Sequence, residues 1–82
     1  MNFTHRDKVE NIENIINELI DSTEIYLNYL HTQKKHQDVK YHRTLNLAIK
    51  EADDLNEALG SIIMDRLVRI KDRQIILDKM NE

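Results

Sequence analysis

The chain has 82 residues, a formal net charge of −3 and no cysteine, so disulfides and thiolate–zinc sites are excluded. No apolar run approaches the roughly 18 residues that a membrane-spanning helix needs. The first ten residues are polar and charged, unlike a signal peptide, and we expect one soluble, cytoplasmic domain over residues 1–82.

Secondary structure is expected to be entirely helical. The chain contains no proline and a single glycine, Gly60, and these are the residue types that most often interrupt helices. Hydrophobic residues make up 40% and charged residues 33% of the chain, a balance that suits amphipathic helices better than disorder. The expected fold class is therefore all-α, with two antiparallel helices forming a hairpin.

The first helix is expected over about residues 4–32. Thr4 is a suitable N-cap, and Asp7 follows where a negative charge favours the positive end of the helix dipole. Residues then recur at alternating spacings of three and four, which is a heptad seam: Val9, Ile12, Ile16, Leu19, Thr23, Tyr26 and Leu30. Further apolar residues widen the stripe, so this helix should pack against at least two neighbours; they are Ile15, Ile20 and Leu27.

The second helix is expected over about residues 38–80, with Asp38 as its N-cap. Its apolar residues keep the same rhythm: Leu45, Ile49, Ala52, Leu59, Ile63, Ile70, Leu77 and Met80. Polar residues interrupt this seam at Asn56, Arg66 and Arg73. We expect the two arginines to pair with acids of the first helix and so to fix the register; the candidates are Glu18, Asp21 and Glu24.

Gly60 leaves two possibilities open. It could end one helix, with Ser61 capping the next, or it could lie inside a continuous helix where another chain segment approaches closely. If Leu30 lies opposite His42, the small residues of the second helix face the bulky part of the first. In this register the first helix offers no partner residues to the second helix beyond about position 68. The apolar residues beyond that point would then need a second chain: Ile70, Ile76, Leu77 and Met80.

A helical bundle, assembled as a homodimer, is the quaternary structure that this pattern predicts. The residues expected to form the dimer or bundle interface are Ile12, Ile16, Leu19, Tyr26, Leu59, Ile63, Ile70 and Leu77.

The turn between the helices is expected at residues 31–38 and is rich in bases. Its candidate partner-binding residues are Lys34, Lys35, His36, Lys40, Tyr41 and Arg43. The nearby histidines are His31, His36 and His42, spaced by five and six residues. Two metal ligands on one helix face need a spacing of three or four, so we expect exposed turn residues and no metal site.

Two acid pairs suggest an alternative chemistry, namely Glu10 with Glu13 and Glu51 with Asp54. Their spacing is similar to that of the acid pairs that hold Mg²⁺ in all-α nucleotide pyrophosphatases. The resemblance is confined to this spacing and implies a Mg²⁺-dependent enzyme. In the expected register Glu13 lies near Leu59, so the two pairs do not converge.

The leading hypothesis is a small non-enzymatic regulator or adaptor, without a cofactor, that binds a protein through its helical faces and its basic turn. A composition rich in Asn, Ile and Lys would suit a phage or mobile-element gene. The first alternative is a nucleic-acid-binding accessory protein that uses the turn and the arginine-rich C-terminal helix. Acids interleave with those arginines and weaken their field: Asp65, Asp72 and Asp78.

Overall fold

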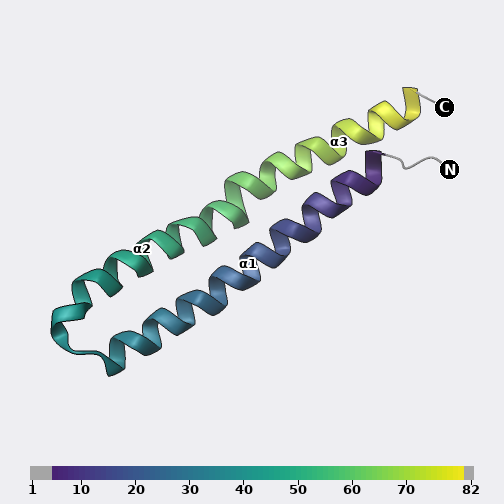
Figure 1. Cartoon of the computed structure of the whole chain (residues 1–82). Coiled ribbons are helices and arrows are strands. Elements are labelled where there is room, and N and C mark those ends of the chain that lie inside the picture. Colours follow the sequence, from purple (N-terminus) through teal and green to yellow (C-terminus); the bar gives the residue numbers. More distant parts are fainter. Residues whose placement is uncertain (1–4, 81–82) are drawn as a thin grey trace.

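Two long antiparallel rods joined by one tight turn make up the molecule (Figure 1). The computed structural model describes residues 5–80. In chain order its elements are the helix α1 (His5–His36), the 3₁₀ turn η1 (Val39–Tyr41), the helix α2 (His42–Ala58), the π-helical segment η2 (Leu59–Ile63) and the helix α3 (Met64–Met80). The prediction of an all-α hairpin is confirmed, and the described residues contain no strand. Thr4, the expected N-cap, lies outside them.

No helix within residues 5–80 is both long enough and apolar enough to cross a membrane.

The turn lies later in the chain than expected. Most of the segment 31–38 is helical, because α1 continues to His36, and the chain reverses at Gln37–Tyr41. Asp38 has an extended backbone before η1, but its side chain makes no capping hydrogen bond. Bases in the last turn of α1 interact favourably with the negative end of its dipole, which helps to carry the helix through this polar stretch.

Buried apolar residues run along the whole hairpin, with Leu30 and Ala52 toward the turn and Leu59 in η2. One buried cluster joins α1 and α3 in the half away from the turn. Val9, Ile16 and Leu67 form a buried cluster, against which Ile20 and Met64 pack. Leu67 is the most deeply buried large side chain, at 1% exposure. Apolar contact of this kind is the main source of stability in a two-helix structure.

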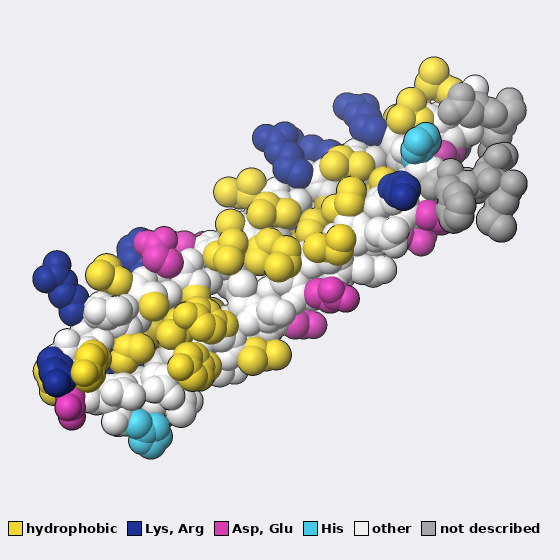
Figure 2. Space-filling model, viewed as in Figure 1, with side chains coloured by type: hydrophobic (Ala, Val, Ile, Leu, Met, Phe, Trp, Pro, Cys, Tyr) yellow, Lys and Arg dark blue, Asp and Glu magenta, His cyan; other side chains and the backbone are white. Residues whose placement is uncertain are grey.

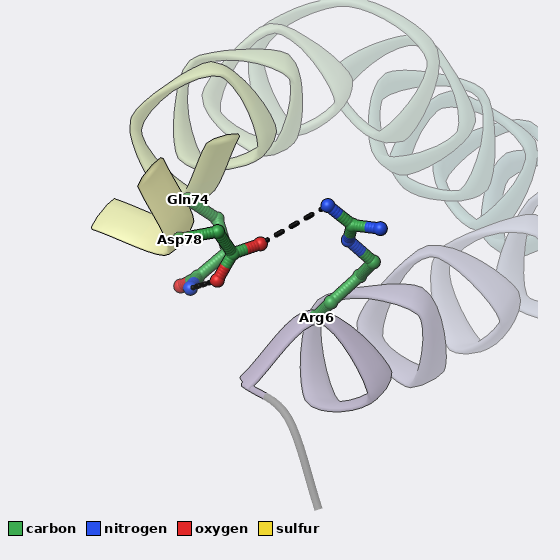
Figure 3. Close-up of polar contacts among 3 residues, drawn as sticks. All are labelled: Arg6, Gln74 and Asp78. Atoms are coloured by element: carbon green, nitrogen blue, oxygen red, sulfur yellow. Dashed lines mark hydrogen bonds and ion pairs between the residues drawn. The ribbon is translucent and has the colours of Figure 1, made fainter. Parts of the chain in front are cut away.

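Ion pairs show that α1 and α3 run side by side to the open end of the hairpin. The Lys71 Nζ lies 3.0 Å from the Glu13 Oε2. Farther out, Arg6 contacts the Asp78 carboxylate at 3.1 Å, while Gln74 donates a hydrogen bond to the other oxygen of that carboxylate at 2.8 Å (Figure 3). The predicted register, in which the first helix offers no partner residues beyond about position 68 of the second, is therefore wrong. The α3 helix does not overhang α1.

A polar contact crosses the middle of the hairpin. The Asn56 Nδ2 donates hydrogen bonds to the Thr23 Oγ1 at 2.6 Å and to the Ile20 carbonyl oxygen at 3.3 Å. The prediction that Asn56 occupies a seam position is confirmed. A satisfied polar group inside an apolar seam disfavours shifted registers, because any slip would bury the amide without partners.

At Gly60 the helix is continuous, as the second possibility predicted, but the predicted close contact is absent, because a Cβ added there would meet no atom within 4 Å. Instead, η2 widens the helix by one residue, as π-helical turns do. Leu59 and Met64 both face α1, five residues apart rather than four. The extra residue rotates α3 by about 100° relative to an uninterrupted α-helix.

This rotation changes which residues of α3 contact α1. The contact row is Met64, Leu67, Lys71, Gln74 and Asp78. The predicted seam residues Arg66 and Arg73 are exposed. Within the described residues they form no ion pair with an acid of α1, so their predicted role in the register is wrong.

Replacing Gly60 by alanine should stabilise the protein. The glycine is exposed with no positive φ, and a Cβ added to it would meet no atom within 4 Å. Alanine favours helix over glycine by about 1 kcal/mol, which corresponds to a rise in Tm of roughly 4–8 °C in a domain of this size. Thermal unfolding followed by circular dichroism at fixed chain concentration measures the change. A fall in Tm would mean that the π-helical segment requires glycine.

Candidate functional site

One side of α1 is apolar but not covered by the other rod. Three residues on this side remain about half exposed: Ile12 at 42%, Leu19 at 46% and Tyr26 at 50%. Each of them directly precedes a residue that contacts the other rod. Ile15 at 55% and Tyr29 at 54% extend the row at helical spacing. The α1 helix therefore carries a second heptad seam beside the one that packs within the hairpin.

The α3 helix carries a matching row. Ile63, Ile70 and Leu77 directly precede the contact residues at 64, 71 and 78, and they are 36%, 46% and 47% exposed. In two antiparallel right-handed helices, rows that precede the contact row by one residue lie on the same side of the pair. Both rows therefore belong to one surface, here named the apolar face: Ile12, Ile15, Leu19, Tyr26, Tyr29, Ile63, Ile70 and Leu77.

Figure 2 shows hydrophobic side chains gathered in a band over the junction of the two rods. The opposite side of the hairpin is mostly polar. On α1 the residues that follow the contact row there are Glu10, Asn17, Glu24 and His31. Val68 and Ile75 of α3 are the apolar residues of that side. The amphipathic character of the hairpin thus assigns one face to burial and one to solvent.

A shallow groove of about 370 Å³ opens beside the turn, and α1, η1 and α2 contribute to it. All three tyrosines of the chain line this groove, namely Tyr26, Tyr29 and Tyr41. The rings of Tyr26 and Tyr29 stack at 6.0 Å between centroids. The i, i+3 spacing of Tyr26 and Tyr29 is the local signal that they share a face, but only the chain reversal brings Tyr41 to them.

The predicted partner-binding residues come together at one end of the hairpin, here named the basic turn. Lys34, Lys35 and His36 lie in the last turn of α1, Lys40 and Tyr41 lie in η1, and Arg43 lies in the first turn of α2. Within residues 5–80 no carboxylate pairs with these bases. The Lys40 Nζ lies 5.0 Å from the centroid of the Tyr41 ring, a cation–π contact. The basic turn therefore presents an excess of positive charge, with Asp38 as the acid within it, around an exposed aromatic ring.

The acid pairs occupy different parts of the rods. Glu13 lies opposite α3, where it pairs with Lys71, whereas Asp54 on α2 pairs with Lys50 at 3.0 Å. A hydrogen bond from Lys50 to Asp54, together with the attraction of that charge, raises the pKa of Lys50. Among residues 5–80, no three histidine, aspartate or glutamate side chains are placed to share a metal ion.

Arginines of α3 form a third feature. Arg66, Arg69 and Arg73 line a shallow groove of about 310 Å³ together with Ile70, Gln74 and Leu77. This groove borders the apolar face, because Ile70 and Leu77 belong to both. Basic side chains flanking an apolar row are common at the edges of helical interfaces.

No family model matches the chain, and neither a curated protein nor a solved structure does. The apolar face and the basic turn are therefore assessed by their own chemistry. The apolar face offers buried contact area, and the basic turn offers charge and hydrogen-bond donors.

Proposed function

We propose that the chain is a non-enzymatic regulator or adaptor that binds an acidic partner protein through its basic turn. The observation that carries this proposal is the concentration of unpaired bases and an exposed tyrosine at one end of a rod whose net charge is −3. Tyrosine and arginine are enriched among residues that dominate binding energy, and lysines around them steer acidic partners. The rod holds this charged end away from the acidic remainder of the chain.

A protein partner agrees better with the charge distribution than a nucleic acid does. The basic turn has four lysine and arginine residues, and the chain as a whole would repel a phosphate backbone at long range. The groove of Arg66, Arg69 and Arg73 supports nucleic-acid binding as a second candidate function. That function requires affinity to fall steeply as salt concentration rises.

Neutralising the basic turn should abolish partner binding without unfolding the protein. The variant replaces Lys34, Lys35, Lys40 and Arg43 by glutamine; none of these side chains is buried. Partner recovery is compared in pull-downs from lysate treated with nuclease, read by quantitative mass spectrometry. We expect at least a tenfold loss of the recovered protein and an unchanged circular dichroism spectrum.

The matched control removes the same charge elsewhere, by glutamine at Lys8, Lys50, Arg69 and Lys79. It should recover the partner as the unmodified chain does. An equal loss of partner recovery in both variants would show that binding depends only on the net charge of the chain. Binding retained by the turn variant would refute the proposal. A partner recovered only without nuclease would favour the nucleic-acid function.

A further inference from the structure

We propose that the apolar face is covered by a second copy of this chain. The two hairpins pack face to face as a four-helix bundle, related by a two-fold axis perpendicular to the rods, so that the two basic turns lie at opposite ends. The apolar face and the basic turn meet at Tyr41, which lines the tyrosine groove, but this inference does not depend on the partner-binding proposal.

One hairpin leaves more surface exposed than a compact protein of its mass does. The chain has 6821 Å² of accessible surface, whereas a compact protein of 9.8 kDa has roughly 5,200 Å². Its radius of gyration is 18.5 Å, against about 12 Å for a compact domain of this length. The excess of roughly 1,600 Å² lies within the range of about 1,000–2,500 Å² that each subunit of an obligate homodimer buries.

Large apolar side chains are exposed along both rods. Eighteen of them are exposed in the described residues, and six apolar residues are buried. Isolated exposed apolar residues are normal, but a continuous row on one face of both rods marks an interaction surface. A second hairpin offers a row of the same length and the same chemistry, as an isologous interface requires.

The shape of the apolar face favours one arrangement of the two copies. An axis midway along α1 brings Tyr26 level with Ile15 of the second copy, and Tyr29 level with Ile12 of the second copy. The tyrosine groove near the turn of each copy then receives the protruding isoleucines from the open end of the other. A two-fold axis along the rods would instead place groove against groove and leave both partly empty, which costs packing energy.

Charged side chains at the edge of the apolar face favour the same arrangement. Glu51 on α2 and Arg73 on α3 each directly precede a residue that faces α1, and both are exposed. They lie at nearly equal distances on either side of Ile62, close to the middle of the α2–α3 rod. The proposed axis therefore brings Glu51 of each copy near Arg73 of the other, and neither residue has an ion-pair partner among residues 5–80.

The arrangement has a consequence for binding. Two basic turns at opposite ends of one bundle make it bivalent, with the turns separated by about the length of the rod, 63 Å. Such a bundle binds either one partner that has two acidic sites at that spacing or two partner molecules. With a two-site partner, the second contact forms at a high effective concentration.

A single introduced cysteine tests the proposal in the full-length chain, which has no cysteine of its own. Ser22 is exposed, continues the α1 row between Leu19 and Tyr26, and lies close to the proposed axis. Ser22→Cys should therefore form a disulfide-linked dimer when oxidised with diamide at micromolar concentration. Non-reducing gel electrophoresis measures the rate at which the linked dimer forms.

Asn17→Cys is the matched control, because Asn17 lies at a similar level of α1 on the polar side and is also exposed. We expect Ser22→Cys to cross-link at least tenfold faster than this control. Equal rates would overturn the proposal. Equal rates are also the result expected for a two-fold axis along the rods, because that axis places the two α1 helices diagonally and prevents the disulfide. Circular dichroism of both variants verifies that each is folded.

Discussion

Replacing Leu67 by alanine is expected to destabilise the protein more than removal of any other single side chain. Leu67 is 1% exposed and packs in the cluster with Val9 and Ile16. Truncation removes its apolar contacts and leaves a cavity in a core too thin to collapse around it. Such Leu→Ala changes cost about 2–5 kcal/mol, so we expect Tm to fall by at least about 10 °C.

Thermal unfolding at the same chain concentration measures this effect, because the stability of an associating protein depends on concentration. Leu47→Ala is the matched control, since Leu47 is 55% exposed in α2. Its cost should remain below about 1 kcal/mol. If the two variants lost equal stability, Leu67 would not face α1, and the rotation of α3 by η2 would be wrong.

Leu19→Asp should have the second largest effect, by separating the two copies. In one hairpin Leu19 is 46% exposed, so a carboxylate there could stay in water at little cost. In the proposed dimer the same side chain is buried near the two-fold axis, where the change would bring two carboxylates together without partners. Such burial costs several kcal/mol, enough to move the chain to monomers or to unfold it.

Asn17→Asp adds the same charge two residues away, on the polar side of α1, and should leave the dimer intact. Sedimentation velocity and circular dichroism, measured on both variants at equal concentration, distinguish the effects. A Leu19→Asp variant with the mass and helicity of the unmodified chain would show that the apolar face is not an interface.

The hairpin itself could be predicted because its cause is local. Heptad spacing and the absence of proline determine where long amphipathic helices form, and one polar, basic stretch is the natural place for the reversal. The exact turn was misplaced by several residues, since Thr32 to His36 are compatible with either a helix end or a turn. Only the packing of α1 against the second rod decides between them.

The register could not be predicted, because it depends on η2. The row Ile63, Ile70 and Leu77 continues the heptad of α2 without a break, so the sequence favours it as the internal seam. In the structure that row lies on the apolar face, and Leu67 is buried inside the hairpin instead. A sequence with two apolar rows, one for each of two interfaces, gives no local signal of which row packs within the chain.

The candidate sites divide in the same way. The residues of the basic turn are close in sequence, so their proximity in space could be predicted. The tyrosine groove joins Tyr26 and Tyr29 to Tyr41 across the reversal, and its existence depends on where the chain turns. Among the residues predicted for the interface, Ile16 and Leu59 are buried within the hairpin, and the other six lie on the apolar face.

The mass of the unmodified chain in solution tests the central claim most directly. Sedimentation equilibrium at several micromolar concentrations should give twice the chain mass of 9.8 kDa, with the high helicity that α1, α2 and α3 require. Dissociation on dilution should be accompanied by loss of helicity, because one hairpin buries too little apolar surface to remain folded alone. A fully helical, stable species of 9.8 kDa at all concentrations would contradict the account.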